Sequence, residues 1–254
     1  MTVRIAMWSG PRNISTAMMR SWENRSDCSV VDEPFYAYYL NKTQSPHPMF
    51  EEIIAAQPTE YGQVIEQLTQ HPCETPLQYQ KHMTHHMLPG VDLEWTRSLR
   101  HCFLIREPAY VVNSYTNSRG VCTSDDIGIV RQYELYETIS ELTGQKIPVV
   151  DTVTVLTNPE LALRKICQSM SIPFETNMLQ WPEGKRESDG VWASHWYHSV
   201  ENSTGFAENK TAPFTLSGEQ QRLVDELQPY YEKMRDRALE ICFQGVKLNS
   251  LAKQ

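Results

Sequence analysis

The N-terminal part of the chain carries a run of residues suited to binding an oxyanion. The run is Gly10-Pro11-Arg12-Asn13-Ile14-Ser15-Thr16, and it separates an apolar segment, residues 3–9, from a helical pattern. The first turn of a helix presents unpaired backbone N–H groups and a partial positive charge, which attract phosphate. Arg12 adds a permanent forked cation, and Ser15 and Thr16 add hydroxyl donors. These features predict a phosphate-binding loop.

The same run differs from the loop of proteins that hydrolyse ATP or GTP. Their pattern, G-x-x-x-x-G-K-[ST], needs a second glycine and a lysine, and both are missing here. The alternative is an ordinary helix capped by Asn or Ser, with Arg12 in solvent. Taken by itself, the run leaves both interpretations open.

A second cation occupies a similar position later in the chain. Arg106 follows a buried apolar segment, residues 101–105, and precedes Pro108, which suits the first turn of a helix. Ser114 lies eight residues beyond Arg106. Ligands of parallel α/β sheets collect at the carboxyl ends of the strands, so Arg106 is a candidate anion contact. The alternative is a surface ion pair with Glu107.

Two kinds of titratable side chain follow other predicted strands. Glu33 comes directly after residues 29–32, and the pair Lys81-His82 ends a weakly alternating segment, with His85 and His86 close by. Imidazole has a pKa suited to accepting a hydroxyl proton near neutrality. Histidines spaced three or four apart also share a helix face and bind metals. No Cys or carboxylate of matching spacing joins these three, so we expect no metal.

The elements that must position these residues alternate between strands and helices. Alternating strands and helices predict an α/β fold of three layers, with a mostly parallel central sheet covered by helices on both faces. No repeat or linker divides the chain, so a single domain over residues 1–254 is expected. Strands are predicted at 3–9, 29–32, 77–82, 101–105 and 147–151; helices at 14–22, 50–68, from 108, 124–142, 159–170 and 217–241; and a long loop at 181–215.

Composition excludes several classes of function. The 254 residues include 23 Lys and Arg against 31 Asp and Glu, a net charge of −8, which disfavours a nucleic-acid partner. No apolar run is long enough to span a bilayer, so no membrane partner is expected. The start of the chain has no secretory pattern, and the six cysteines form no CxxC pair, so we expect a reduced, cytoplasmic protein.

Taken together, the motifs resemble those of the sulfotransferase family. Gly10 to Thr16 is similar to the family's 5′-phosphosulfate-binding loop, although Asn13-Ile14 stands where that loop usually has Ser-Gly. Arg106 and Ser114 resemble the family's 3′-phosphate-binding pair. Residues 158–174 resemble a late family motif, with Gln168-Ser169-Met170-Ser171 in place of its Phe-Leu-Gly stretch. The three matches occur in the family's order and span residues 3–175.

The resemblance implies a P-loop NTPase-like sulfotransferase fold and a sulfuryl transfer without metal. The co-substrate would be 3′-phosphoadenosine 5′-phosphosulfate, and the acceptor a hydroxyl or amine of a small molecule. In-line displacement needs positioning, charge stabilisation and a base. Arg12 would stabilise the leaving oxygen, with Ser15 and Thr16 at the 5′-phosphate. Arg106 and Ser114 would hold the 3′-phosphate.

The resemblance leaves the base and the late aromatic segment open. Some bacterial members place a catalytic Glu where Glu33 stands, while cytosolic members use a Lys-x-His similar to Lys81-His82; His85 or His86 are further candidates. Gly190-Val191-Trp192 resembles a segment that covers the nucleotide, but residues 190–206 equally suit an acceptor pocket. The alternatives are an ATP-dependent small-molecule kinase and a non-catalytic nucleotide-binding protein. A homodimer is compatible with the sequence, and the acceptor is not readable from it.

Overall fold

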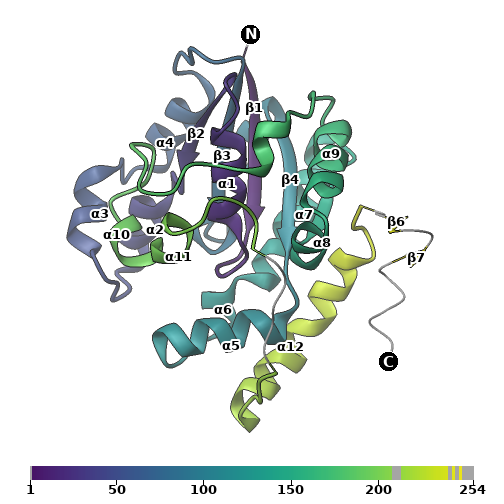
Figure 1. The fold of residues 1–254 in the computed structure, drawn as a ribbon. Helices are drawn as coiled ribbons and strands as arrows, with labels where there is room; N and C mark the ends of the chain where they lie inside the picture. The colour runs from purple at the N-terminus through teal and green to yellow at the C-terminus, as the bar shows by residue number, and fades with distance from the viewer. Residues whose placement is uncertain (1, 208–212, 240–241, 244–245, 248–254) are drawn as a thin grey trace.

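A five-stranded parallel sheet forms the centre of the molecule. The computed structural model describes residues 2–207, 213–239, 242–243 and 246–247. The strand order is β2-β3-β1-β4-β5, and every neighbouring pair is parallel (Figure 1). This arrangement confirms the predicted α/β class with helices on both faces. The strands are β1 (Val3–Ser9), β2 (Cys28–Asp32), β3 (Leu77–Met83), β4 (Arg100–Ile105) and β5 (Val149–Asp151).

One face of the sheet packs against the helices that follow the first two strands and β5. Alternate residues of the strands point to this side, including Ile5 and Met7 of β1 and Tyr79 of β3, and they meet Trp22 of α1 in a continuous apolar core. The helices around this core are α1 (Ser15–Glu23), α2 (Tyr36–Thr43), α3 (Phe50–Ala56), α8 (Thr152–Thr157), α9 (Pro159–Ser169), η3 (Thr176–Leu179), α10 (Ala193–Trp196) and α11 (His198–Glu201).

The opposite face carries a second apolar core, built on the intervening strand residues. Trp8 of β1 and Phe103 of β4 lie here with Leu135 and Leu227 of the covering helices, all of them fully buried. Elements on this side are α4 (Tyr61–Thr69), η1 (Thr84–His86), η2 (Glu94–Ser98), α5 (Pro108–Arg119), α6 (Ser124–Ile127), α7 (Ile129–Thr143) and α12 (Gly218–Arg235). A short antiparallel pair, β6 (Cys242–Phe243) and β7 (Val246–Lys247), follows.

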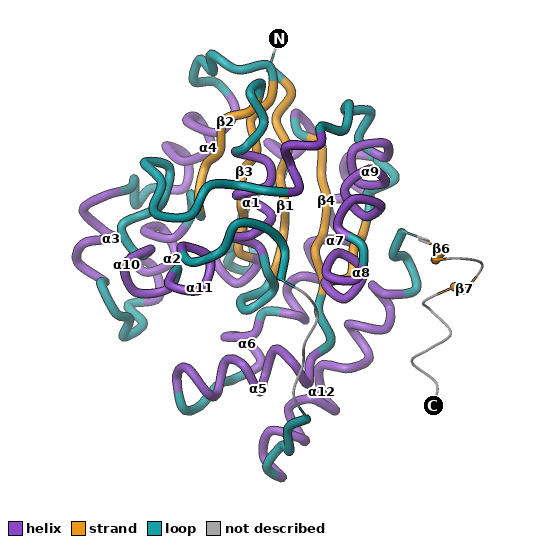
Figure 2. Tube along the Cα trace, in the orientation of Figure 1, coloured by secondary structure: helices purple, strands orange, loops and turns teal. Residues whose placement is uncertain are grey.

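The helix boundaries differ from the sequence prediction at several points. The helix expected over 50–68 is two helices, because Pro58 lies between α3 and α4 and cannot donate a helical hydrogen bond. The helix expected over 124–142 breaks at Gly128, whose φ is +67°. α2 and α8 were not predicted, and the long loop contains α10 and α11 (Figure 2). The last helix ends at Arg235, and Ile241 lies outside the described residues.

The parallel sheet brings the carboxyl ends of its five strands to one edge. Each strand has its carboxyl end there, and β1 is central, with β3 on one side and β4 on the other. The loop after β1 therefore lies between the chain segments that follow β3 and β4. Among the helices that the structure describes, none is long and apolar enough to cross a membrane.

Candidate active site

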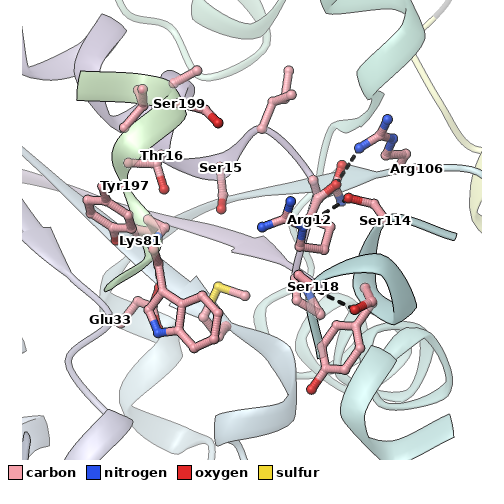
Figure 3. A pocket seen from close by; sticks show the side chains of 18 of the residues that line it. Arg12, Ser15, Thr16, Glu33, Lys81, Arg106, Ser114, Ser118, Tyr197 and Ser199 are labelled. Carbon is pink, nitrogen blue, oxygen red and sulfur yellow. Dashed lines mark hydrogen bonds and ion pairs between the residues drawn. The ribbon is translucent and has the colours of Figure 1, made fainter. Parts of the chain in front are cut away.

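A cavity of about 420 Å³ opens at the carboxyl edge of the sheet. Its walls come from the loop after β1, the end of β2, the end of β3, α5 and the segment from α10 onward. Figure 3 shows Arg12, Ser114 and Arg106 toward one side of this view and Glu33, Lys81 and Tyr197 toward the other. The predicted residues that line the cavity are Pro11, Arg12, Asn13, Ile14, Ser15, Thr16, Glu33, Arg106 and Ser114; Gly10 and His82 are not among its lining residues.

The loop after β1 is held in an unusual backbone conformation. Arg12 and Ile14 have φ values of +57° and +46°, a left-handed region that β-branched residues rarely adopt. Alternating backbone handedness makes successive N–H groups converge on a concavity that suits an anion. Ile14 thus adopts the left-handed conformation at the position where the family's loop usually has glycine. Such strain is concentrated at functional sites.

Buried side chains and close packing fix this loop. Asn13 is buried, donates to the backbone oxygen of Leu104 at 2.6 Å, and accepts from Thr152. Its amide therefore ties the loop to β4 and α8. Gly10 is required by packing, because a Cβ there would lie 2.8 Å from the backbone oxygen of Ile127. The Asn13 amide and the close packing at Gly10 therefore both fix the position of the loop.

Two guanidinium groups meet at the cavity wall. Arg12 donates from Nε to the Ser114 hydroxyl at 2.9 Å, and Arg106 donates to the backbone oxygen of Arg12 at 2.6 Å. Burial lowers the pKa of both arginines, and the charge of Arg12 lowers the pKa of Arg106 further. Within the described part of the chain, no carboxylate forms an ion pair with either side chain. Two adjacent cations without a counter-ion favour binding of an anion.

On the other side of the cavity, a buried lysine joins two consecutive carboxylates. Asp32 and Lys81 are paired in the register of β2 and β3, and Lys81 Nζ lies 2.9 Å from Asp32 Oδ1 and 2.5 Å from Glu33 Oε1. The Tyr197 hydroxyl donates to Asp32 Oδ2 at 2.7 Å and lies 2.7 Å from Lys81 Nζ. The backbone N–H of Gly190 also donates to Asp32. This network connects the segment 190–197 to the ends of β2 and β3.

Glu33 is the carboxylate of this network that reaches the cavity. Its φ is +41°, so strained backbone turns it out of line with β2. Burial raises the pKa of Glu33 above its ordinary value; the charge of Lys81 opposes this rise, and the charge of Asp32 adds to it. Burial alone lowers the pKa of Lys81, but Asp32 and Glu33 outweigh burial and leave it well above its ordinary value. A carboxylate with a raised pKa is a stronger base than one in solvent.

His82 lies on the opposite side of the sheet from Glu33 and Lys81. It stacks on Trp8 with ring centroids 4.4 Å apart and contacts Gln80 at 3.1 Å. Burial lowers the pKa of His82 to about 3. Because side chains alternate along β3, adjacent Lys81 and His82 face different cores. Glu33 therefore lines the cavity, whereas His82 is not among its lining residues.

His85 and His86 also have pKa values lowered by burial. His85 lines the cavity, and burial lowers its pKa to about 3, while His86 is sandwiched between Tyr36 and Tyr39. Among the described residues, no group of three or more His, Cys, Asp or Glu side chains is arranged to hold a metal ion.

Three cavity-lining groups were not found by the sequence reasoning. Lys81 was considered only with His82, Tyr197 only as part of an aromatic segment, and Arg119 not at all. Arg119 is one residue after Ser118 on the face of α5 that also carries Ser114 and Tyr115. The spacing of 114, 115, 118 and 119 follows one helix face and is the signal that identifies it.

The fold and the site define an α/β protein with a strained loop and two arginines at the carboxyl edge of a parallel sheet. A sequence model of the sulfotransferase domain family matches residues 3–238. The chain therefore belongs to the sulfotransferase domain family.

Similar proteins extend this comparison. Two Arabidopsis thaliana proteins, branched-chain-amino-acid aminotransferase-like proteins 1 and 2, are 31% and 29% identical to this chain over 231 residues. The match covers 91% of this chain, and it spans 41% of the length of these relatives.

Solved structures share the fold at lower identity. The sulfotransferase domain from the curacin biosynthetic pathway has a TM-score of 0.55 at 17% identity, covering 90% of this chain and 98% of that domain. A sulfotransferase from Alicyclobacillus acidocaldarius has a TM-score of 0.52 at 7% identity, covering 93% and 94% of the two chains.

Proposed function

We propose that the protein transfers a sulfuryl group from 3′-phosphoadenosine 5′-phosphosulfate to a hydroxyl or amine of a small-molecule acceptor. The observation that carries the proposal is the pair of adjacent guanidinium groups, Arg12 and Arg106, beside a strained loop at a helix N-terminus. The donor has a phosphosulfate at one end of its ribose and a phosphate at the other. A site for it needs two cationic positions, and the presence of Arg12 and Arg106 at the cavity supports the proposal.

The residues present fit such a donor. The loop from Pro11 to Thr16 would hold the 5′-phosphosulfate through its N–H groups and hydroxyls, and Arg12 would stabilise the charge left on the departing oxygen. Arg106 and Ser114 would bind the 3′-phosphate. A sulfur–oxygen or sulfur–nitrogen bond would form to the acceptor while the sulfur–oxygen bond of the donor breaks, and the electron pair of the broken bond would leave with the 5′-phosphate oxygen of the nucleotide.

Glu33 would accept the proton that the acceptor loses. Its carboxylate lines the cavity, and the raised pKa favours proton transfer from a hydroxyl. Lys81 would be a positioning residue, because it acts on the reaction through its hydrogen bond to Glu33. The side chain is 1% exposed, so water does not compete for this contact. Asp32 and Tyr197 hold Lys81 in turn.

A ligand comparison tests the donor. Thermal stabilisation of the chain is measured with 3′-phosphoadenosine 5′-phosphate, with ADP and with Mg-ATP, followed by sulfuryl transfer to a panel of hydroxylated compounds. A ligand at 100 times its Kd stabilises the native state by about 2.7 kcal/mol. Selective stabilisation by the 3′-phosphorylated nucleotide is expected. A response to Mg-ATP alone would indicate a kinase, and nucleotide binding without transfer to any acceptor would indicate a binding protein.

Glu33→Gln tests the base. We expect turnover to fall by about 10²- to 10⁴-fold, because the amide cannot accept the proton, while affinity for 3′-phosphoadenosine 5′-phosphate stays within about twofold. His82→Gln is the matched variant of the other candidate, and it should retain turnover. If the two variants behave in the opposite way, His82 is the base.

A further inference from the structure

A third guanidinium stands at the cavity in surroundings different from those of Arg12 and Arg106. Arg119 ends α5, and its guanidinium lies 4.3 Å from the centre of the Trp196 ring. A terminal nitrogen of Arg119 lies 2.7 Å from Nε2 of His47. Stacking and a hydrogen bond together hold the guanidinium in place at the cavity wall.

The partner of Arg119 carries no charge. Nδ1 of His47 lies 2.8 Å from the backbone oxygen of Pro48, which can only accept, so Nδ1 bears the hydrogen. Nε2 then has a lone pair to accept from Arg119, and it also lies 2.7 Å from the Tyr36 hydroxyl. Burial lowers the pKa of His47 to about 4, which agrees with a neutral ring. Arg119 is therefore fixed by a neutral acceptor.

The charge of Arg119 is not neutralised by any carboxylate that the structure describes. Within the described ranges, no carboxylate forms an ion pair with it, and it is exposed at the cavity. The charge of Arg119 acts on groups at both sides of the cavity. It lowers the pKa of Arg12 and opposes the rise in the pKa of Glu33. Arg119, the loop and Glu33 thus line the same cavity, in which the acceptor would also bind.

The walls around this cation are aromatic. Tyr36 and His47 pack edge to face with ring centroids 5.2 Å apart, and His47 and Trp196 are 6.0 Å apart. Tyr39 also lines the cavity. Rigid aromatic walls favour a flat, apolar ligand body, and the cation favours an acidic group on it.

We infer that the acceptor is a hydroxylated aromatic acid, whose carboxylate or other anionic group is bound by Arg119 while its hydroxyl faces Glu33. The inference rests on the proposed function and narrows its acceptor to a chemical class. Arg119 is then a specificity-determining residue, distinct from the arginines assigned to the nucleotide.

The test compares two probes that differ in one charge. Calorimetric titrations of 4-hydroxyphenylacetate and of its neutral amide are made into the chain saturated with 3′-phosphoadenosine 5′-phosphate, so that the nucleotide cations are occupied. We expect the acid to bind at least about tenfold more tightly than the amide, as expected for a hydrogen-bonded charge pair. Arg119→Gln should remove this difference, and Arg119→Lys should keep part of it. Arg222→Gln, at an exposed arginine of α12 outside the cavity, should leave it unchanged.

The remaining outcomes separate the two proposals. Equal binding of acid and amide, or binding of neither, overturns the inference, as does a preference that survives Arg119→Gln. Loss of nucleotide affinity in Arg119→Gln would assign Arg119 to the nucleotide and also overturn it. If 3′-phosphoadenosine 5′-phosphate does not bind the unaltered chain, the proposed function is wrong. The two probes titrated into the nucleotide-free chain then still decide for or against Arg119.

Discussion

Arg106 has one observed contact and one proposed role, and an experiment can separate them. It donates to the backbone oxygen of Arg12, which supports the loop, and it is proposed to bind the 3′-phosphate. Arg106→Ala should weaken binding of 3′-phosphoadenosine 5′-phosphate by about 10- to 100-fold more than binding of ADP, because only the former has a 3′-phosphate. Calorimetry with both ligands measures the ratio. Equal losses would restrict Arg106 to supporting the loop.

Lys81 controls the charge of Glu33 in the same network. Its ammonium opposes the rise in the pKa of Glu33, so removing it in Lys81→Met should raise that pKa further. Glu33, the proposed base, would then be protonated over more of the acidic range, and the acid limb of the kcat/KM profile should move to higher pH. Lys81→Arg keeps the cation and should shift the limb less. A limb that stays in place in Lys81→Met would show that Glu33 is not the base.

Sequence reasoning found the residues of this site that belong to local motifs and missed those that depend on strand register. The loop after β1 and Arg106 are readable because each follows a strand and begins a helix. The contact between Lys81 and Asp32 depends on the pairing of β2 with β3, 49 residues apart, and Tyr197 reaches them from 116 residues beyond Lys81. Sequence spacing carries no information on such contacts.

At the scale of elements, the alternating strands and helices were predicted and their interruptions were not. Pro58 inside the predicted helix over 50–68 was a visible signal for a break. The break at Gly128 is harder to predict, because one glycine is tolerated in many helices. There the chain turns between α6 and α7 to pack on η1, and this depends on the tertiary structure.

The two glycines that flank α7 allow the cost of close packing to be separated from the cost of backbone strain. Gly128 and Gly144 have φ values of +67° and +66°, but a Cβ at Gly128 would lie 3.2 Å from His85 and Thr84, while one at Gly144 meets nothing within 4 Å. Gly144→Ala should lower the free energy of unfolding by about 1–2 kcal/mol, the cost of a left-handed residue. Gly128→Ala should lower it further. Urea denaturation measures both, and equal losses would mean that the neighbours yield without cost.

At the scale of the whole molecule, the charge of the site opposes that of the chain. The protein has a net charge of −8, yet Arg12, Arg106 and Arg119 are gathered around one cavity. The net charge argues against a broad basic surface for nucleic acid. It does not indicate where a small anion could bind, because composition does not place individual residues. The chain also spans only 41% of the length of its Arabidopsis relatives, so their activity as whole proteins does not transfer to it.

Buried histidines make the stability of the whole molecule depend on pH. His101 accepts from Trp8 Nε1 at Nδ1 and contacts the backbone oxygen of Thr96 through Nε2, so it must be neutral, and burial lowers its pKa from 6.5 to about 4. The lowered pKa of His82 has the same cause. Below pH 6.5 the unfolded chain binds protons that the folded chain does not, so these groups make folding less favourable as pH falls toward 4.

Removing one such histidine isolates its contribution. Glu33, Glu107 and Asp151 have raised pKa values, which act in the opposite direction, but they are common to both proteins in a comparison. His101→Gln should therefore reduce the loss of stability between pH 6.5 and pH 5 by up to about 1.4 kcal/mol per pH unit relative to the unaltered chain. Urea denaturation at several pH values measures this difference. Parallel curves for the two proteins would mean that His101 takes up its proton in the folded state as readily as in the unfolded one.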